Sequence, residues 1–456
     1  MTSEVDRTHD VRRQSWVASA TGHADFPIQN LPYGIFTHGG RSGAVGIAIG
    51  EEILDLAAAI DAGLLDGQAL SAATRSIGST LNRYMALSPA DRGALRRALS
   101  DLLANDTESG ARASLVRDDI LVPQSACGML MPAQVGDYTD FFAGIHHARN
   151  AGRKMRSAED PLWPNYLHVP IAYHGRSSSI DISGSTVARP NGQVLNSGDA
   201  APALMPCQAL DYEFELGAWI GTGNARGDHI PIENAGRHIA GFCLLNDWSA
   251  RDIQMWEAQP LGPFLAKNFA TTVSPWVITI EALAPFFTAV PPRPQGYPEP
   301  LAYLRDDDDQ RTGALDIVLE AFLATDRTRA TGAAPHRLSR ANTLDLYWTF
   351  AQMVAHHTVG GCTLRPGDLF GSGTISAETR NGFGSLMELS AFGTDPVALD
   401  GETRTFLQDG DEVILKGRCV AEGFASIGFG DCRGRVTATP IATRAARSPN
   451  VSFEEA

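Results

Sequence analysis

Residues 210–221, LDYEFELGAWIG, decide the fold, because polar and apolar side chains alternate along them. In an extended strand this alternation places Glu213 and Glu215 on one face with Asp211, and large apolar side chains on the other. Two neighbouring carboxylates repel each other unless the face is solvated, one group is protonated, or a cation neutralises both. Of these three conditions, a solvated face is the commonest reason for two carboxylates to lie side by side on a strand. This motif therefore predicts a strand and leaves a cation site open.

The composition of the 456 residues predicts a large globular protein of two domains, with 43% hydrophobic and 20% charged residues. A formal net charge of -15 disfavours a surface that binds the phosphate backbone of a nucleic acid, so we expect no nucleic-acid partner. No apolar run approaches the roughly 20 residues of a membrane span, and the N-terminus lacks a signal-like apolar core. Six scattered cysteines without a CxxC pair suggest neither a disulfide scaffold nor a zinc site. We therefore expect a cytoplasmic protein without a membrane partner.

The pattern along the chain predicts a mainly β protein with α+β elements, in three parts. Residues 1–24 are polar and unpatterned, which predicts a flexible N-terminal extension. Residues 25–120 combine short strand patterns with helical spacing, which predicts a small β-rich domain and a helical connector. Within it, residues 86–104 are typical of an amphipathic helix with one solvated face. Residues 121–456 contain many short apolar runs separated by Gly and Pro, and predict a large β-rich domain.

A further carboxylate stands in GFCLLNDWSARDIQMWE, residues 241–257. An apolar run ends there at Asp247 and helical spacing follows, so Asp247 lies at a predicted strand-to-helix junction. Helix N-capping is the commoner use of Asp at such a place. Loops that follow a strand also display ligand groups on a rigid scaffold. Both interpretations of Asp247 stay open on this motif.

Acidic, basic and histidine side chains concentrate in VGDYTDFFAGIHHARNAGRKMR, residues 135–156. If the segment after Asp140 is helical, Asp140 lies at its start and His147 follows two turns later on the same face. A general base beside a metal-bound substrate is then possible, and a structural histidine fits the spacing equally well. Ligands that are all carboxylate oxygens favour Ca²⁺ or Mg²⁺ over zinc or copper. The pair at 356–357 lacks the HExxH pattern and is interpreted as structural.

Six segments, in this order, resemble the fumarylacetoacetase family from about Asp25 to about Arg435. They are DYTDFFAGIHHARNAG, PNYLHVPIAYHGRSSSI, LDYEFELGAWIGTGN, NDWSARDIQMWEAQPLGPFLAKNFATTVSPWV, LRPGDLFGSGTIS and TRTFLQDGDEV. The resemblance implies a small SH3-like N-terminal barrel, a large β-roll-like catalytic domain and a homodimer. It also implies metal-dependent hydrolysis of a carbon-carbon bond of 4-fumarylacetoacetate to fumarate and acetoacetate, the last step of tyrosine and phenylalanine catabolism. Alternatives are a hydrolase of another acylpyruvate or β-diketone and, from another class, a cation-binding scaffold.

The resemblance also implies roles for individual residues. The cation ligands, for Ca²⁺ or Mg²⁺, fall on Asp140, Glu213, Glu215 and Asp247. The general base falls on His147, which Glu388 would orient. A second Mg²⁺ site matches Asp247, Lys267 and Thr271.

Residues expected to contact the diketo acid substrate fall on Phe142, Arg156, Tyr173, Gln254, Ala258, Lys267 and Thr374. Among these, Gln254 and Lys267 would stabilise the developing alkoxide, and Arg156 would pair with a terminal carboxylate. Phe142 and Ala258 depart from the family pattern, because each stands where a tyrosine is expected. The departures leave the preferred acyl group open.

Overall fold

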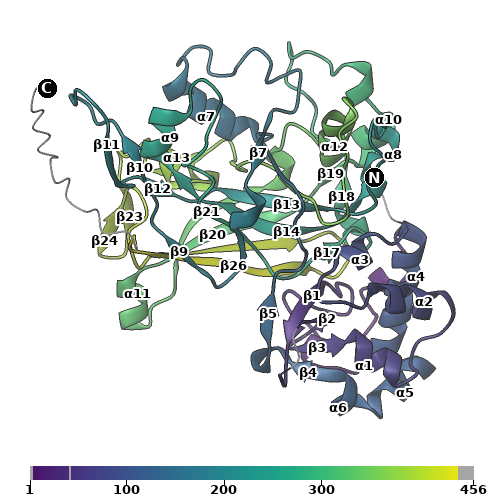
Figure 1. The fold of residues 1–456 in the computed structure, drawn as a ribbon. Helices are drawn as coiled ribbons and strands as arrows, with labels where there is room; N and C mark the ends of the chain where they lie inside the picture. The colour runs from purple at the N-terminus through teal and green to yellow at the C-terminus, as the bar shows by residue number, and fades with distance from the viewer. Residues whose placement is uncertain (1–3, 41–42, 440–456) are drawn as a thin grey trace, which may run out of the picture.

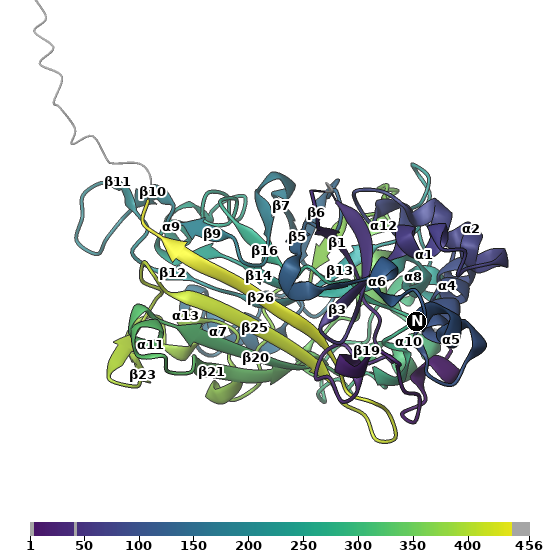
Figure 2. The same cartoon turned by 90° about the horizontal axis from the view of Figure 1, so that it is seen from below.

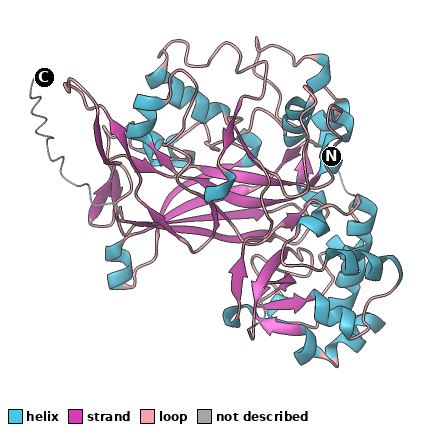
Figure 3. Ribbon diagram, in the orientation of Figure 1, coloured by secondary structure: helices cyan, strands magenta, loops and turns pink. Residues whose placement is uncertain are grey.

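The computed structural model describes residues 4–40 and 43–439, which form two packed units. Figure 1 shows the smaller N-terminal unit in purple and blue at the lower right of the larger unit. Figure 3 shows helices gathered on one side of the small unit and long strands through the middle of the large one. The protein is a mixed α/β structure.

A five-stranded antiparallel sheet in the order β4-β3-β2-β1-β5 organises the N-terminal unit. Its strands are β1 (Tyr33–Thr37), β2 (Ala44–Ile49), β3 (Glu52–Asp55), β4 (Leu121–Pro123) and β5 (Gly128–Leu130). Between β3 and β4 lie α1 (Leu56–Asp61), α2 (Gly67–Ser76), α3 (Asn82–Met85), α4 (Pro89–Leu103), α5 (Glu108–Ser114) and α6 (Arg117–Ile120). No pairing joins the edge strands β4 and β5 within the described residues, so an SH3-like barrel stays a prediction.

Helix α4 is buried on more than its apolar face. Ser88 caps its N-terminus, and Leu95 and Leu99 are fully buried, as the amphipathic pattern predicts. Arg92 is also buried, and its Nε donates to Glu281 Oε1 of the large unit at 2.9 Å. The prediction of one solvated face is therefore wrong at Arg92, because an acidic partner across the interface compensates its buried charge.

Residues 4–24 pack against the rest of the protein, which corrects the flexible extension predicted at 1–24. Residues 1–3 lie outside the described part. His9 is buried, and its Nε2 lies 2.8 Å from the backbone carbonyl oxygen of Glu281. A polar sequence without periodicity can therefore be held by long-range contacts that composition does not reveal.

The N-terminal unit also ends later than predicted. Strands β4 and β5 belong to its sheet, although the sequence assigns residues 121 onward to the large domain. In the register of β1 with β5, Ile35 stands opposite Leu130. The short apolar runs of this stretch look like those of the large domain, so composition places the boundary too early.

Two main sheets form the large unit, and Figure 2 shows the long strands of the second sheet from below. The first has the order β7-β6-β22-β13-β14-β16-β8, with β17 paired to β14. Its strands are β6 (Tyr138–Phe141), β7 (Ala172–Gly175), β8 (Ile180–Ile182), β13 (Phe214–Ile220), β14 (Ile239–Asp247), β16 (Thr271–Val273), β17 (Ile278–Thr279) and β22 (Leu369–Gly371). The second sheet, in the order β21-β20-β25-β26-β9, contains β9 (Thr186–Ala188), β20 (Val318–Ala324), β21 (His336–Asn342), β25 (Glu412–Cys419) and β26 (Ile427–Thr437).

Helices and short strand pairs surround these sheets. The helices are α7 (Ile145–Met155), α8 (Ile232–Ala235), α9 (Arg251–Glu257), α10 (Asp307–Thr312), α11 (Asp326–Thr331), α12 (Phe350–Thr358) and α13 (Leu386–Leu389). The short pairs are β10 (Asn191–Val194) with β11 (Ala203–Pro206), β12 (Leu210–Asp211) with β15 (Ser249–Ala250), β18 (Phe287–Thr288) with β19 (Ala314–Leu315), and β23 (Val397–Leu399) with β24 (Glu402–Arg404). Across residues 4–40 and 43–439, none of the helices combines the length and apolarity needed to span a membrane. All six cysteines are free thiols.

The strand predicted at 210–221 forms in two pieces, β12 and β13, with Glu213 between them. Tyr212 and Phe214 enter the main core, as the alternation predicts. Glu213 and Glu215 are 5% and 0% exposed. This burial excludes the solvated face that the sequence left open.

Candidate active site

Three carboxylates from three strands of the first sheet meet inside the large unit. Asp140 lies in β6, Glu215 in β13, and Asp247 at the end of β14. Each offers an oxygen, and these oxygens lie within 4.8 Å of one another. The helix predicted after Asp140 begins only at Ile145, because the backbone at Asp140 pairs with β7 and β22 instead. Asp140 and His147 therefore come from different elements.

Strand β22 lies between β6 and β13 and makes room for two of these acids. Gly371 stands opposite Asp140 in one pairing and opposite Gly217 in the other. A methyl group at Gly371 would lie 2.7 Å from Asp140 Oδ1 and 2.7 Å from Glu215 Oε2, inside van der Waals contact. The missing side chain at this position is what lets the two carboxylates approach each other.

The electrostatics of the cluster favour protons or a cation. Burial raises the pKa of Asp140 well above its ordinary value, and the charge of Asp247 raises it further. Burial, followed by Asp140 and Asp247, does the same to the pKa of Glu215. Asp140 Oδ1 and Glu215 Oε1 are buried without a hydrogen-bond partner among the described residues. These bare oxygens are hard donors of the kind that Mg²⁺ and Ca²⁺ prefer.

Hydroxyl groups contact the remaining oxygens of Asp140 and Asp247, whereas the backbone N–H of Gly373 donates to Glu215 Oε2 at 3.0 Å. The Tyr173 hydroxyl lies within hydrogen-bond distance of two carboxylate oxygens, 3.0 Å from Asp140 Oδ2 and 2.8 Å from Asp247 Oδ2. Tyr138 also donates to Asp140 Oδ2, at 3.0 Å, and Thr271 donates to Asp247 Oδ1 at 3.2 Å. The Tyr173 hydroxyl, predicted to contact substrate, thus orients two acids in this structure.

Helix α9 starts at Arg251, beyond Asp247, with Ala250 as its N-cap residue and no side-chain cap. Asp247 is therefore not a helix cap. Arg251 Nε donates to Asp211 Oδ2 at 2.9 Å, and its Nη1 lies 2.7 Å from Glu213 Oε1. Its Nη2 is buried without a partner in the described part of the chain. The sequence reasoning missed Arg251, although a cation in the first turn of a helix opposes the helix dipole and signals another role.

Glu213 is held by cations rather than by the acid cluster. It is paired with Arg251 and Lys267, and Lys267 Nζ lies 2.6 Å from Asp247 Oδ2. Burial acts to raise the pKa of Glu213, but the charges of Lys267 and Arg251 outweigh it and leave this pKa below its ordinary value. Burial acts to lower the pKa of Lys267, but Asp247 and Glu213 outweigh it and raise this pKa. Lys267 is therefore an ammonium group, which has no lone pair for a metal.

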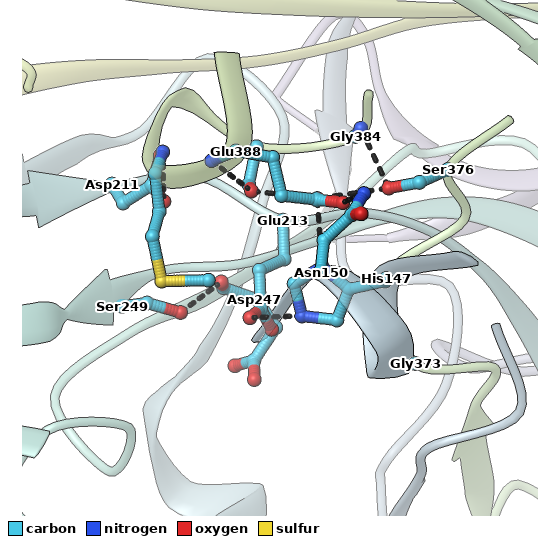
Figure 4. Close-up of polar contacts among 12 residues, drawn as sticks. His147, Asn150, Asp211, Glu213, Asp247, Ser249, Gly373, Ser376, Gly384 and Glu388 are labelled. Atoms are coloured by element: carbon cyan, nitrogen blue, oxygen red, sulfur yellow. Dashed lines mark hydrogen bonds and ion pairs between the residues drawn. The ribbon is translucent and has the colours of Figure 1, made fainter. Parts of the chain in front are cut away.

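A histidine and a carboxylate far apart in sequence form a buried pair. His147 Nδ1 lies 2.7 Å from Glu388 Oε2, across 241 residues of chain. Glu388 also accepts hydrogen bonds of 2.8 Å from Asn150, Ser376 and Ser385, and Figure 4 shows Glu388 between His147 and Ser376. Burial acts to raise the pKa of Glu388, but His147 and these donors lower it below its ordinary value. Glu388 is thus an anion that fixes the orientation of the imidazole.

One cavity of about 690 Å³ joins these groups. The predicted site residues on its wall are Asp140, Phe142, His147, Tyr173, Glu213, Glu215, Gln254, Lys267 and Thr374. His147 Nε2 lies 3.7 Å from Glu213 Oε1, and Thr374 Oγ1 is buried without a partner among the described residues. Phe142 packs edge-on against His147, with ring centroids 5.6 Å apart. Asp247, Thr271 and Glu388 lie behind the wall in contact with it.

The structure places Arg156 and Ala258 outside the cavity wall, so their roles as substrate contacts stay predictions. Arg156 follows the end of α7 and turns back, where it donates to the carbonyl oxygens of Asp160 and Leu162 and stacks on Trp163. Ala258 only ends α9 as its C-cap residue. Local turns after two helices, which the sequence does not specify, remove both side chains.

Comparison with known sequences places this site in a family. Residues 138–437 match the family described as fumarylacetoacetate (FAA) hydrolase C-terminal, and residues 29–132 match fumarylacetoacetase N-terminal. The chain belongs to the fumarylacetoacetase family. A rice (Oryza sativa subsp. japonica) fumarylacetoacetase is 43% identical over 93% of this chain and 97% of its own length. The fumarylacetoacetases of Caenorhabditis elegans and Homo sapiens are 45% and 44% identical, over 93% and 91% of this chain and 99% and 96% of theirs.

The N-terminal family match ends at residue 132, close to the end of β5. It therefore agrees with the boundary that the sheet indicates, and not with a large domain beginning at residue 121. In this member of the fumarylacetoacetase family, the cavity lies wholly within the segment matched by the C-terminal family model.

Proposed function

We propose that the protein hydrolyses a carbon-carbon bond of 4-fumarylacetoacetate to yield fumarate and acetoacetate, the last step of tyrosine and phenylalanine catabolism. The relatives named fumarylacetoacetase match nearly the full chain and support this activity. The observation that carries the proposal is one cavity whose wall contains Asp140 and Glu215 of the buried carboxylate cluster and His147 of the histidine-carboxylate pair.

A divalent cation, Mg²⁺ or Ca²⁺, fits the cluster of Asp140, Glu215 and Asp247. Two bare buried oxygens and two raised pKa values indicate a site that gains from positive charge. When bound there, such a cation would polarise the oxygens of a 1,3-diketone and act as an electron sink. Glu213 remains a proposed fourth ligand, and a second Mg²⁺ at Asp247, Lys267 and Thr271 is disfavoured by the ammonium group of Lys267.

The chain supplies the proton transfers and the charge stabilisation. His147, held by Glu388, would take a proton from water as the water oxygen attacks the carbonyl carbon of the fumaroyl half. Lys267, Gln254 and the free Nη2 of Arg251 would donate to the developing alkoxide, an effect worth about 3 kcal/mol for a well-placed donor. Collapse breaks the carbon-carbon bond and releases the acetoacetate half as an enolate. A proton then restores the ketone.

An absorbance assay for loss of fumarylacetoacetate tests the proposal. Protein treated with a chelator should be inactive, and added Mg²⁺ or Ca²⁺ should restore turnover. His147→Ala should lower kcat by about 10²- to 10⁴-fold, the usual contribution of a general base, while cation binding measured by calorimetry persists. His146→Ala is a matched control, because His146 does not line the cavity and faces Asp345 at 3.6 Å. Full turnover in His147→Ala would refute its role as base.

A second candidate is an acylpyruvate hydrolase with another acyl preference, which Phe142 favours because it offers no hydroxyl to the substrate. Comparison of kcat/KM for fumarylacetoacetate with that for short acylpyruvates separates the two. We also propose a cytoplasmic homodimer. Sedimentation of the purified protein tests the dimer, and microscopy of a tagged chain tests the location.

A further inference from the structure

Lys154 stands on the cavity wall without a partner. It follows His147 by seven residues on α7, so it lies two turns farther along the same face, about 10.5 Å along the axis. The small residues Ala151 and Gly152 line the wall nearby. The side chain of Lys154 is exposed, and it makes no ion pair or hydrogen bond with the described residues.

The other cationic side chains of this region form ion pairs with carboxylates of the same chain. Arg251 is paired with Asp211 and Glu213, and Lys267 is paired with Glu213 and Asp247. Arg156, the cation that the sequence suggests for a substrate carboxylate, is paired with Asp160 at 2.8 Å and lies outside the wall. Lys154 is thus the uncompensated positive charge on the wall formed by the described residues.

Lysine is also rare in this chain, which makes its position informative. Of 37 lysines and arginines only three are lysines, Lys154, Lys267 and Lys416. Two of the three line one cavity. The chain uses arginine nearly everywhere else, so a merely solvated charge at Lys154 would be expected to be arginine. A lysine ammonium is a compact charge with rotating donors, which suits an anion that arrives at the end of a flexible ligand.

We propose that Lys154 binds the terminal carboxylate of the acyl half of the substrate, and this proposal rests on the proposed function. In fumarylacetoacetate that carboxylate is separated from the reacting carbonyl by a carbon-carbon double bond, and it is the carboxylate farther from the diketone. Lys154 is likewise farther along α7 than His147, by about 10.5 Å of helix axis. Leu162 and Trp163 on the wall provide apolar surface for the double bond.

Binding of two small acids measures this contact directly. Fumarate carries a carboxylate at both ends, whereas crotonate has a methyl group in place of one of them. Calorimetry with Mg²⁺-loaded protein should show tighter binding of fumarate than of crotonate. Lys154→Met should weaken fumarate binding about fivefold, as expected for an exposed ion pair, and leave crotonate binding unchanged. Lys154→Arg should retain most of the preference.

Lys416→Met is the matched control, because Lys416 is exposed on β25 and pairs with Asp431 at 3.4 Å, away from the cavity. Thermal unfolding shows whether each variant is folded. Lys154→Gln is a second neutral variant in case Lys154→Met does not fold. The proposal is overturned if both neutral variants keep the preference for fumarate, or if the unaltered protein has none. A lysine-dependent preference without hydrolysis of fumarylacetoacetate would instead refute the proposed function and leave this carboxylate site standing.

Discussion

Two glutamates only two positions apart, Glu213 and Glu215, have pKa values shifted in opposite directions. Glu215 faces Asp140 across the gap left by Gly371 and lies close to Asp247, and its pKa is raised by burial and by the charges of both acids. Glu213 is equally buried, but two cations contact it and its pKa is lowered. The alternating sequence predicts that both are on one strand face. It does not reveal their partners, because Lys267 and Arg251 arrive from other segments.

Removal of the cation should make the stability of the fold decrease as pH rises. Asp140 and Glu215 have raised pKa values when folded, whereas the unfolded chain releases these protons near pH 4. Their contribution is therefore complete below that pH and is lost as pH rises through the folded values. In the presence of a chelator, the thermal unfolding midpoint should decrease as pH rises from about 5 to about 8. Added Mg²⁺ or Ca²⁺ should remove most of this decrease.

The double variant Asp140→Asn/Glu215→Gln is the control for this pH dependence. Its amides do not titrate, so the midpoint should change little with pH and should not respond to the cation. A midpoint of the unaltered, chelated protein that rises over the same pH range would contradict the assignment.

At the scale of elements, β22 sets the spacing of the acids because it separates β6 from β13 without a side chain at Gly371. Gly371→Ala would place a methyl group against Asp140 and Glu215. We expect at least tenfold weaker cation binding in calorimetry, about 1.4 kcal/mol, with a corresponding loss of activity. Gly93→Ala is the matched control, because its new methyl group meets only Arg97, a flexible exposed side chain. Unchanged cation affinity in Gly371→Ala would refute the spacing argument.

The elements also mark where sequence reasoning stops. The alternation at 210–221 and the strand-to-helix junction at Asp247 are local signals, and the structure agrees with both. The strand at Asp140 is not a local signal, because it depends on pairing with β22, more than two hundred residues later. The contact of His147 with Glu388 is equally remote in sequence, and only the family resemblance predicts it.

At the scale of the whole molecule, the two units share an apolar core cluster, and buried polar contacts join them as well. Glu281 of the large unit receives His9 at its backbone carbonyl oxygen and Arg92 at its carboxylate. Arg92 and Glu281 have side chains only 1% and 7% exposed. The segment expected to be a free extension therefore helps to fix the small unit on the large one.

This buried pair should make the small unit important for the stability of the whole chain. Arg92→Met leaves the Glu281 charge buried without a partner, which should cost about 3–5 kcal/mol in denaturant unfolding. The double variant Arg92→Met/Glu281→Gln should recover part of this loss, because the unpaired charge is gone. Arg337→Met breaks an exposed pair with Glu320, at 3.0 Å, and should cost less than about 1 kcal/mol. Equal effects of Arg92→Met and Arg337→Met would show that the two units do not depend on this contact.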